Sequence, residues 1–135
     1  MERLILDTTI LIAAERATTA IDQVVGDEDD IAIAAITAAE LLVGVQLADE
    51  GRAAARRSFV EAVLSTIVVL PYDLDVARTH GDLLAHTRRT GRARGAHDLL
   101  IAATARASAR TIVTADAAGF EDLPDVTVRP LPLSR

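Results

Sequence analysis

The chain has 135 residues, half of them apolar, and a formal net charge of −6. This length suits a single domain with a real core, and the composition is typical of a soluble globular protein, not a disordered one. Cysteine and lysine are both absent, which excludes disulfides, thiolate zinc sites, Walker-type phosphate loops and Schiff-base lysines. Aromatic residues make up 2% of the chain, so base stacking on aromatic side chains is not expected.

No segment approaches the roughly 18 consecutive apolar residues that a membrane-spanning helix needs. The acidic residues Glu2 and Asp7 come too early for a secretory signal peptide. We therefore expect a cytoplasmic protein with no membrane partner.

The first half of the chain predicts two buried segments and several helices. Residues 3–7 (RLILD) form an apolar run that ends on an aspartate, which is typical of a short buried strand. Residues 31–35 fit either a strand or another buried segment. Residues 37–48 have apolar residues at helical spacing, and Thr37 and Glu40 match a capping box. The other elements expected here are helices over 12–16 and about 18–25, an acidic turn at 26–30, and a helix from Gly51 through about Leu64.

The second half continues the alternation of strands and helices. Residues 66–71 (TIVVLP) indicate a β-branched strand stopped by a proline, and residues 110–116 repeat the opening pattern of a strand that closes on an aspartate. The other elements expected here are a helix over 74–90 ending at Gly91, a helix over 98–109 and an edge strand over 126–130. This order predicts an α/β fold in one domain over residues 1–135, with a short, mostly parallel sheet covered by helices on both faces.

Four carboxylates fall near the ends of these strands, where open parallel sheets bind ligands. Asp7 ends the first strand and Asp116 lies just after the fourth. Glu40 is expected in the first turn of the helix that follows the second strand, and Asp98 at the start of the helix before the fourth. Taken singly, each has an ordinary explanation as a cap or as a charge favoured by the helix dipole.

The capping interpretation suits these acids unequally. It is the simpler explanation for Glu40 and Asp116, but Thr8 and Thr9 are the better-placed caps near Asp7. If the acids converge instead, their mutual repulsion in a partly dehydrated cleft requires a cation. Oxygen ligands without cysteine suit Mg²⁺ or Mn²⁺ rather than zinc.

The segments LILDTTILI, ITAAELLVG, GAHDLLIAATA and TIVTAD resemble those of the PIN-domain ribonucleases, above all the VapC toxins of bacterial type II toxin–antitoxin systems. The resemblance covers nearly the whole chain. It implies a three-layer α/β/α sandwich and a magnesium-dependent endoribonuclease in which Mn²⁺ can substitute. It also implies an RNA substrate, a cognate VapB-type antitoxin lying across the acidic pocket, and a homodimer.

The resemblance assigns roles to the acids. Asp7 and Asp98 match the positions that hold the metal most directly, while Glu40 and Asp116 match those that complete the pocket, often through water. Magnesium would polarise the scissile phosphate and lower the pKa of a water that attacks in line. Glu40 or Asp116 would orient that water, and the products would carry a 5′-phosphate and a 3′-hydroxyl.

Further residues are candidates for contacting the substrate or supporting the acids. Thr8 and Thr114 match family positions whose hydroxyls hydrogen-bond the acids or the scissile phosphate. Arg92 and Arg94 lie just upstream of the helix that carries the third acid, and are either phosphate contacts or solvated charges. His97 could tune the neighbouring acid or touch RNA, and packing explains it equally well.

One position departs from the family pattern. Gly119 stands where the last acid of the fourth-strand motif usually falls. The sequence therefore leaves undecided whether a second metal ion binds, and Glu121 and Asp122 are the nearest acids that could replace the missing one. A catalytically weak PIN domain that binds RNA or a partner is therefore one alternative. A magnesium-dependent phosphatase of the haloacid-dehalogenase type is another, and a receiver-like signalling domain a third. Both of these normally need a lysine, and the phosphatase also needs an aspartate where Thr9 stands.

Overall fold

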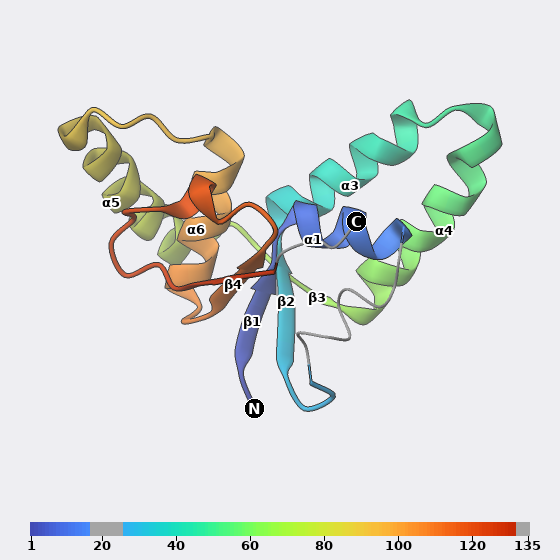
Figure 1. Cartoon of the computed structure of the whole chain (residues 1–135), viewed down its shortest axis with the longest axis horizontal. Coiled ribbons are helices and arrows are strands. Elements are labelled where there is room, and N and C mark those ends of the chain that lie inside the picture. The colour runs from blue at the N-terminus through green and yellow to red at the C-terminus, as the bar shows by residue number, and fades with distance from the viewer. Residues whose placement is uncertain (17–25, 132–135) are drawn as a thin grey trace.

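The computed structural model describes residues 1–16 and 26–131, and the helix predicted over about 18–25 lies outside these ranges. Figure 1 shows how strands and helices alternate along the described chain. The strands are β1 (Arg3–Leu6), β2 (Asp30–Ala34), β3 (Val68–Leu70), β4 (Thr111–Thr114) and β5 (Val128–Pro130). The helices are α1 (Thr8–Arg16), α3 (Ala35–Leu47), α4 (Glu50–Thr66), α5 (Leu74–Thr90) and α6 (Ala96–Ala107), with a short 3-10 helix, η1 (Ala117–Phe120), before β5.

The strands form one five-stranded sheet in the order β3-β2-β1-β4-β5, and every pairing is parallel. In β1, Ile5 pairs with Ala32 of β2 on one side and with Ile112 of β4 on the other. The chain builds outward from β1 to β3 and then returns to add β4 and β5 on the other side. The strand order therefore reverses between β1 and β4, and such a switch point opens a crevice at the carboxyl ends of the strands, where ligands bind.

Helices cover both faces of the sheet, with α5 and α6 on one face and α1, α3 and α4 on the other (Figure 1). Successive residues of β1 point to opposite faces. Ile5 accordingly packs with α5 and α6, whereas Leu4 and Leu6 pack with α1, α3 and α4. The three-layer α/β/α sandwich expected from the sequence is confirmed. None of the helices in the described ranges is long and apolar enough to cross a membrane.

The capping box predicted at Thr37 and Glu40 is wrong. α3 begins at Ala35, directly after β2, so Thr37 lies inside the first turn, and its hydroxyl is buried without a hydrogen-bond partner. Glu40 is the sixth residue of the helix, about one turn further along than expected. The apolar sequence of β2 runs into α3 without an intervening turn, and the Thr-x-x-Glu pattern therefore places the start too late.

Other helix limits also differ from the expected ones. α1 begins at Thr8 and α6 at Ala96, earlier than the predicted starts at residues 12 and 98. α4 begins before Gly51, because the Asp49 side chain accepts a hydrogen bond from a backbone N–H of its first turn at 3.1 Å. α5 ends as predicted at Gly91, whose φ of 68° is the left-handed conformation typical of a helix end.

The strands are shorter than the predicted ranges. Residues 66–71 give only the three residues of β3, because Thr66 still belongs to α4, and residues 110–116 give the four residues of β4. Of residues 31–35, for which the sequence left two interpretations open, residues 31–34 form most of β2 and Ala35 begins α3. The edge strand expected over residues 126–130 is β5.

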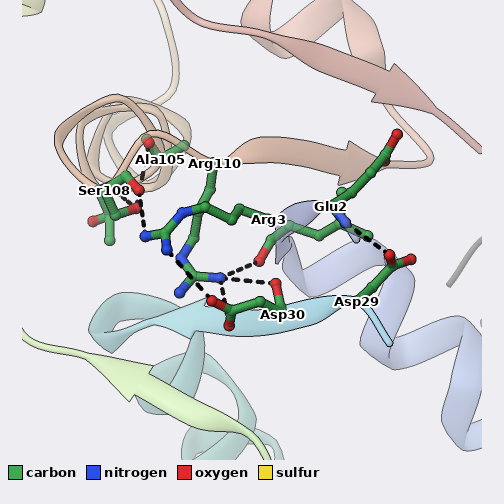
Figure 2. Close-up of polar contacts among 9 residues, drawn as sticks. Glu2, Arg3, Asp29, Asp30, Ala105, Ser108 and Arg110 are labelled. Carbon is green, nitrogen blue, oxygen red and sulfur yellow. Dashed lines mark hydrogen bonds and ion pairs between the residues drawn. The ribbon is translucent and has the colours of Figure 1, made fainter. Parts of the chain in front are cut away.

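Arg110 joins the amino ends of β1 and β2 to the start of β4 (Figure 2). Its Nη1 donates to the carbonyl oxygens of Leu4 at 3.1 Å and Asp30 at 2.8 Å, and lies 3.1 Å from Asp30 Oδ1. Arg3 contacts the same carboxylate at 3.5 Å and donates to the Ser108 carbonyl at 2.9 Å. Arg110 is only 8% exposed, and the contacts of Nη1 replace part of the water that its guanidinium loses on folding, whereas its buried Nε has no hydrogen-bond partner.

Arg110→Ala is expected to lower the free energy of unfolding by about 2 kcal/mol, because it removes a buried donor to two carbonyl oxygens and leaves Arg3 as the remaining ion-pair partner of the half-buried Asp30. Urea unfolding measures the change. The exposed Arg89→Ala is the control, with an expected change within about 0.5 kcal/mol. A loss below about 1 kcal/mol for Arg110→Ala would contradict this role.

Candidate functional site

The four acids predicted from the sequence lie around the switch point between β1 and β4. Asp7 directly follows β1, and Asp116 follows β4 after one intervening residue. Glu40 belongs to α3, which follows β2, and Asp98 is the third residue of α6. The charges of Asp7, Asp116 and Glu40 all act on Asp98, so the fold brings the four carboxylates into one neighbourhood.

Asp7 is the most buried of these acids, with 3% of its surface exposed. Its Oδ1 accepts hydrogen bonds from Thr9 Oγ1 at 2.5 Å and from the Ile10 N–H at 3.3 Å, and its Oδ2 accepts one from the Thr114 hydroxyl. Burial raises the pKa of Asp7, and the hydrogen bonds from Thr114, Thr9 and Ile10 oppose that rise. The apolar run at the start of the chain thus buries a carboxylate that is held by hydroxyl and amide donors.

Asp7 also caps α1, because its bond to the Ile10 N–H is the contact that an N-cap residue makes. Capping and a place in the acidic site therefore coexist at this residue. The expectation that Thr8 and Thr9 are better-placed caps is wrong, since both lie inside α1. The capping interpretation of Asp116 is wrong too, because its side chain accepts no capping hydrogen bond at the start of η1.

Each carboxylate oxygen of Glu40 has a partner from another helix. Thr8 Oγ1 of α1 donates to Oε1 at 2.7 Å, and His97 Nδ1 of α6 lies 3.2 Å from Oε2. The His97 side chain is 55% exposed, so it is not a core residue. Glu40 therefore links the two helices that border the crevice.

Asp98 is the acid on which the other charges converge. Burial raises its pKa most, and the charges of Asp7, Asp116 and Glu40 raise it further, while His97 opposes the rise. An ionised carboxylate among three like charges is destabilised unless a cation neutralises the group. This is the electrostatic environment that the sequence analysis expected at a metal site.

Thr9 is a supporting residue that the sequence analysis did not assign to the site. Besides donating to Asp7, its hydroxyl accepts a hydrogen bond from the Ala115 N–H at 3.0 Å. Thr114 makes the matching pair of contacts, donating to Asp7 and accepting from the Asp116 N–H at 3.0 Å. The two threonines tie the ends of β1 and β4 together across the switch point. The available signal was the pair of threonines that directly follows the first acid.

The two arginines proposed as phosphate contacts have partners within the protein. Arg92 forms an ion pair with Asp122. Arg94 donates from Nη1 to the carbonyl oxygen of Ala118 at 3.0 Å and from Nη2 to that of Glu121 at 2.6 Å. Both therefore fasten the segment after β4, and contact with RNA stays a prediction for each.

The two nearby acids suggested as substitutes for the one missing at Gly119 are Glu121 and Asp122. The Asp122 carboxylate is paired with Arg92. Neither Asp122 nor Glu121 is among the charges that act on Asp98. Substitution of either acid for the one missing at Gly119 stays a prediction, and Asp122 is already paired with Arg92.

The donor set suits a hard divalent cation. The four acids offer only oxygen ligands, which Mg²⁺ and Mn²⁺ prefer. Within residues 1–16 and 26–131, no group of three His, Asp or Glu side chains is arranged to enclose an ion. Mg²⁺ needs no such cage, because it commonly binds through one or two carboxylates and keeps several waters. The crowded charge around Asp98 therefore fits this cation in chemistry and in the number of ligands required.

Comparisons with known proteins agree with this arrangement. A family model described as PIN domain matches residues 4–126. Over 131 residues the chain is 32% identical to a protein named Ribonuclease VapC from Rickettsia bellii, an alignment that covers 96% of this chain and 97% of the relative.

Solved structures show the same fold. A member of the VapBC family of toxin-antitoxin systems, VapBC-5 from Mycobacterium tuberculosis, matches with a TM-score of 0.79 and 30% identity, covering 96% of this chain and 99% of that one. VapBC2 from Rickettsia felis, solved bound to a DNA fragment from its promoter, matches with a TM-score of 0.85 over 95% of this chain and 98% of that one. Its 24% identity supports the fold alone.

Proposed function

The chain belongs to the PIN-domain family, and on this premise we propose that it is an endoribonuclease that requires Mg²⁺, with Mn²⁺ able to substitute. The observation that carries the proposal is the gathering of three like charges around Asp98 at the switch point of the sheet. The name of the Rickettsia bellii relative, a ribonuclease, supports RNA as the substrate class.

In this proposal Asp7 and Asp98 hold the cation directly, and Glu40 and Asp116 complete its pocket, in part through water. When bound, the cation supplies Lewis-acid chemistry, polarising the scissile phosphate and lowering the pKa of water. No side chain is needed as a nucleophile, which agrees with the absence of cysteine and lysine.

The surrounding side chains hold the acids in place. Thr9 and Thr114 fix both oxygens of Asp7, so this carboxylate has one orientation before any ligand arrives. Thr8 and His97 do the same for Glu40, which suits Glu40 for orienting the attacking water. Preorganised acids of this kind need little rearrangement when substrate binds.

We also propose that a cognate VapB-type antitoxin inhibits the protein. The solved relatives named VapBC are toxin–antitoxin pairs, and α3 exposes apolar side chains on which a partner chain can pack. Leu42, Val43 and Leu47 are 43%, 53% and 80% exposed. The homodimer and the cytoplasmic location stay predictions.

Metal removal tests the proposed activity. Structured RNA incubated with the purified protein and Mg²⁺ is expected to be cut into fragments with 5′-phosphate ends. EDTA is expected to stop the reaction and excess Mg²⁺ to restore it. Gel electrophoresis with end-group labelling gives the readout.

Two other outcomes would support different functions. RNA that is bound but not cut at any Mg²⁺ or Mn²⁺ concentration would support the catalytically weak PIN domain, the alternative that Gly119 favours. Turnover of a small phosphomonoester without RNA cleavage would support the phosphatase.

A further inference from the structure

The Asp98 carboxylate lies between two glycines from different segments. A Cβ placed on Gly95, the N-cap residue of α6, would be 3.3 Å from Asp98 Oδ2. A Cβ placed on Gly119 of η1 would be only 2.6 Å from the same oxygen. Real Cβ atoms essentially never approach so closely, so any side chain at position 119 must displace the carboxylate.

Backbone conformation does not explain the glycine at 119. Gly119 has a φ that any residue can adopt. Among the glycines that the structure describes, only Gly91 has a positive φ. The constraint on Gly119 is therefore the space beside Asp98. In Figure 1, η1 lies close above α6, and the two elements are in contact.

Arg94 joins the two segments that lie on either side of the Asp98 carboxylate, the N-terminus of α6 and the region of η1. It directly precedes Gly95, and its guanidinium donates to the carbonyl oxygens of Ala118 at 3.0 Å and Glu121 at 2.6 Å. These carbonyls lie on either side of Gly119 in the sequence. One side chain thus fixes the distance between the α6 N-terminus and η1, and so the width of the gap that Asp98 occupies.

We propose that Gly95, Gly119 and Arg94 form a positioning device that fixes the Asp98 carboxylate for cation binding, and that position 119 must lack a side chain for this reason. This inference rests on the proposed function. It makes Arg94 a positioning residue rather than a phosphate contact. It also means that, where the family usually has an acid at position 119, this chain has a glycine whose backbone packs closely against Asp98.

Substitution of Gly119 distinguishes an effect on cation binding from an effect on the stability of the fold. Gly119→Ala is expected to weaken Mn²⁺ binding about 10-fold or more, the effect of losing an outer partner of a metal ligand, because Asp98 swings away from the added methyl. The melting temperature is expected to stay unchanged or to rise slightly, since only a short side chain must move and alanine restricts the unfolded chain. Isothermal titration with Mn²⁺ and thermal unfolding of the metal-free protein give the two readouts.

Gly81→Ala is the matched control, since an added Cβ there meets no atom within 4 Å; we expect unchanged Mn²⁺ affinity. Gly119→Asp distinguishes two explanations of the glycine. If position 119 merely lacks a metal ligand, the new carboxylate supplies one and strengthens binding; if the position must stay free of a side chain, the new carboxylate displaces Asp98. We expect Gly119→Asp to bind Mn²⁺ more weakly than the unsubstituted chain. Tighter binding by Gly119→Asp, or unchanged affinity in Gly119→Ala, would overturn the proposal.

Substitution of Arg94 tests whether its hydrogen bonds to the Ala118 and Glu121 carbonyl oxygens position Asp98. Arg94→Gln is expected to weaken Mn²⁺ binding and to lower kcat with little change in KM, and Arg94→Lys, which keeps one donor group, is expected to recover part of both. The exposed Arg57→Gln is the control for loss of a positive charge. A raised KM with a shallower salt dependence and unchanged Mn²⁺ affinity would instead make Arg94 a phosphate contact.

Failure of this inference is distinguishable from failure of the proposed function. If the unsubstituted chain neither binds Mn²⁺ nor cuts RNA, the metal-dependent nuclease itself is wrong. If it does both, and the Gly119 and Arg94 variants match it, only the positioning device is wrong.

Discussion

Asp7→Asn is expected to abolish RNA cleavage while the chain stays folded. The change removes the buried charge at the carboxyl end of β1, where the proposed site needs a cation ligand. The loss of activity should exceed the roughly 10–100-fold that follows removal of an outer partner of a metal ligand. The fold should persist, because the Thr9 and Thr114 hydroxyls that donate to Asp7 can rotate and accept from an asparagine amide.

Cleavage assays in saturating Mg²⁺, together with circular dichroism and thermal unfolding, measure both parts of this prediction. Asp75→Asn, an exposed acid in the first turn of α5, is the matched control and should retain full activity. Near-normal cleavage by folded Asp7→Asn protein would remove Asp7 from the metal site. An unfolded variant would leave Asp98→Asn to decide whether the acids matter for cleavage.

Asp98→Asn is expected to have opposite effects on activity and stability. Cleavage should fall by more than about 100-fold, for the same reason as at Asp7. The melting temperature of the metal-free protein should rise, because asparagine keeps the shape of the side chain and removes a charge that burial and three neighbouring acids disfavour. Stability given up for a functional cluster of charges is a common cost at active sites.

The pH dependence follows from the sign of the shift. Burial and the neighbouring acids raise the pKa of Asp98 above its ordinary 3.8, so the folded protein holds this proton more readily than the unfolded chain. Its contribution to stability is therefore fully present below pH 3.8 and is lost as the pH rises through the raised pKa. Asp98→Asn should reduce that loss, because asparagine carries no charge at any pH.

Thermal unfolding of the metal-free proteins across a pH series measures this effect. Asp75→Asn again serves as the control, because it removes a first-turn helix charge without relieving any crowding. We expect the control to be slightly less stable than the unsubstituted chain. A lower melting temperature for Asp98→Asn than for this control would contradict the charge crowding.

The sequence predicted the parts of the fold that repeat a strong local pattern. Apolar strands that alternate with helices led to a parallel sheet with two covered faces, and acids at the strand ends led to the site. The helix starts were less predictable, because a start depends on where the preceding strand stops pairing. At Thr37 the capping pattern was present, but β2 continues directly into α3 and leaves the threonine inside the helix.

The supporting residues of the site were harder to predict, because their roles come from contacts across long stretches of chain. Thr9 meets Ala115 only because β1 and β4 are neighbours in the sheet. Arg94 had the sequence context of a phosphate contact, but its partners are carbonyl oxygens in η1 and just after it. Gly119 reads in the sequence as a missing acid, and only its distance to Asp98 gives it a positive role.

All of these roles depend on a divalent cation binding among the gathered acids, and anomalous diffraction from a crystal soaked in Mn²⁺ locates such an ion. We expect a manganese peak within coordination distance, about 2.0–2.2 Å, of carboxylate oxygens from both Asp7 and Asp98. A protein that cuts RNA while its crystals show no peak there, or a peak only at other acids, would contradict the proposed site.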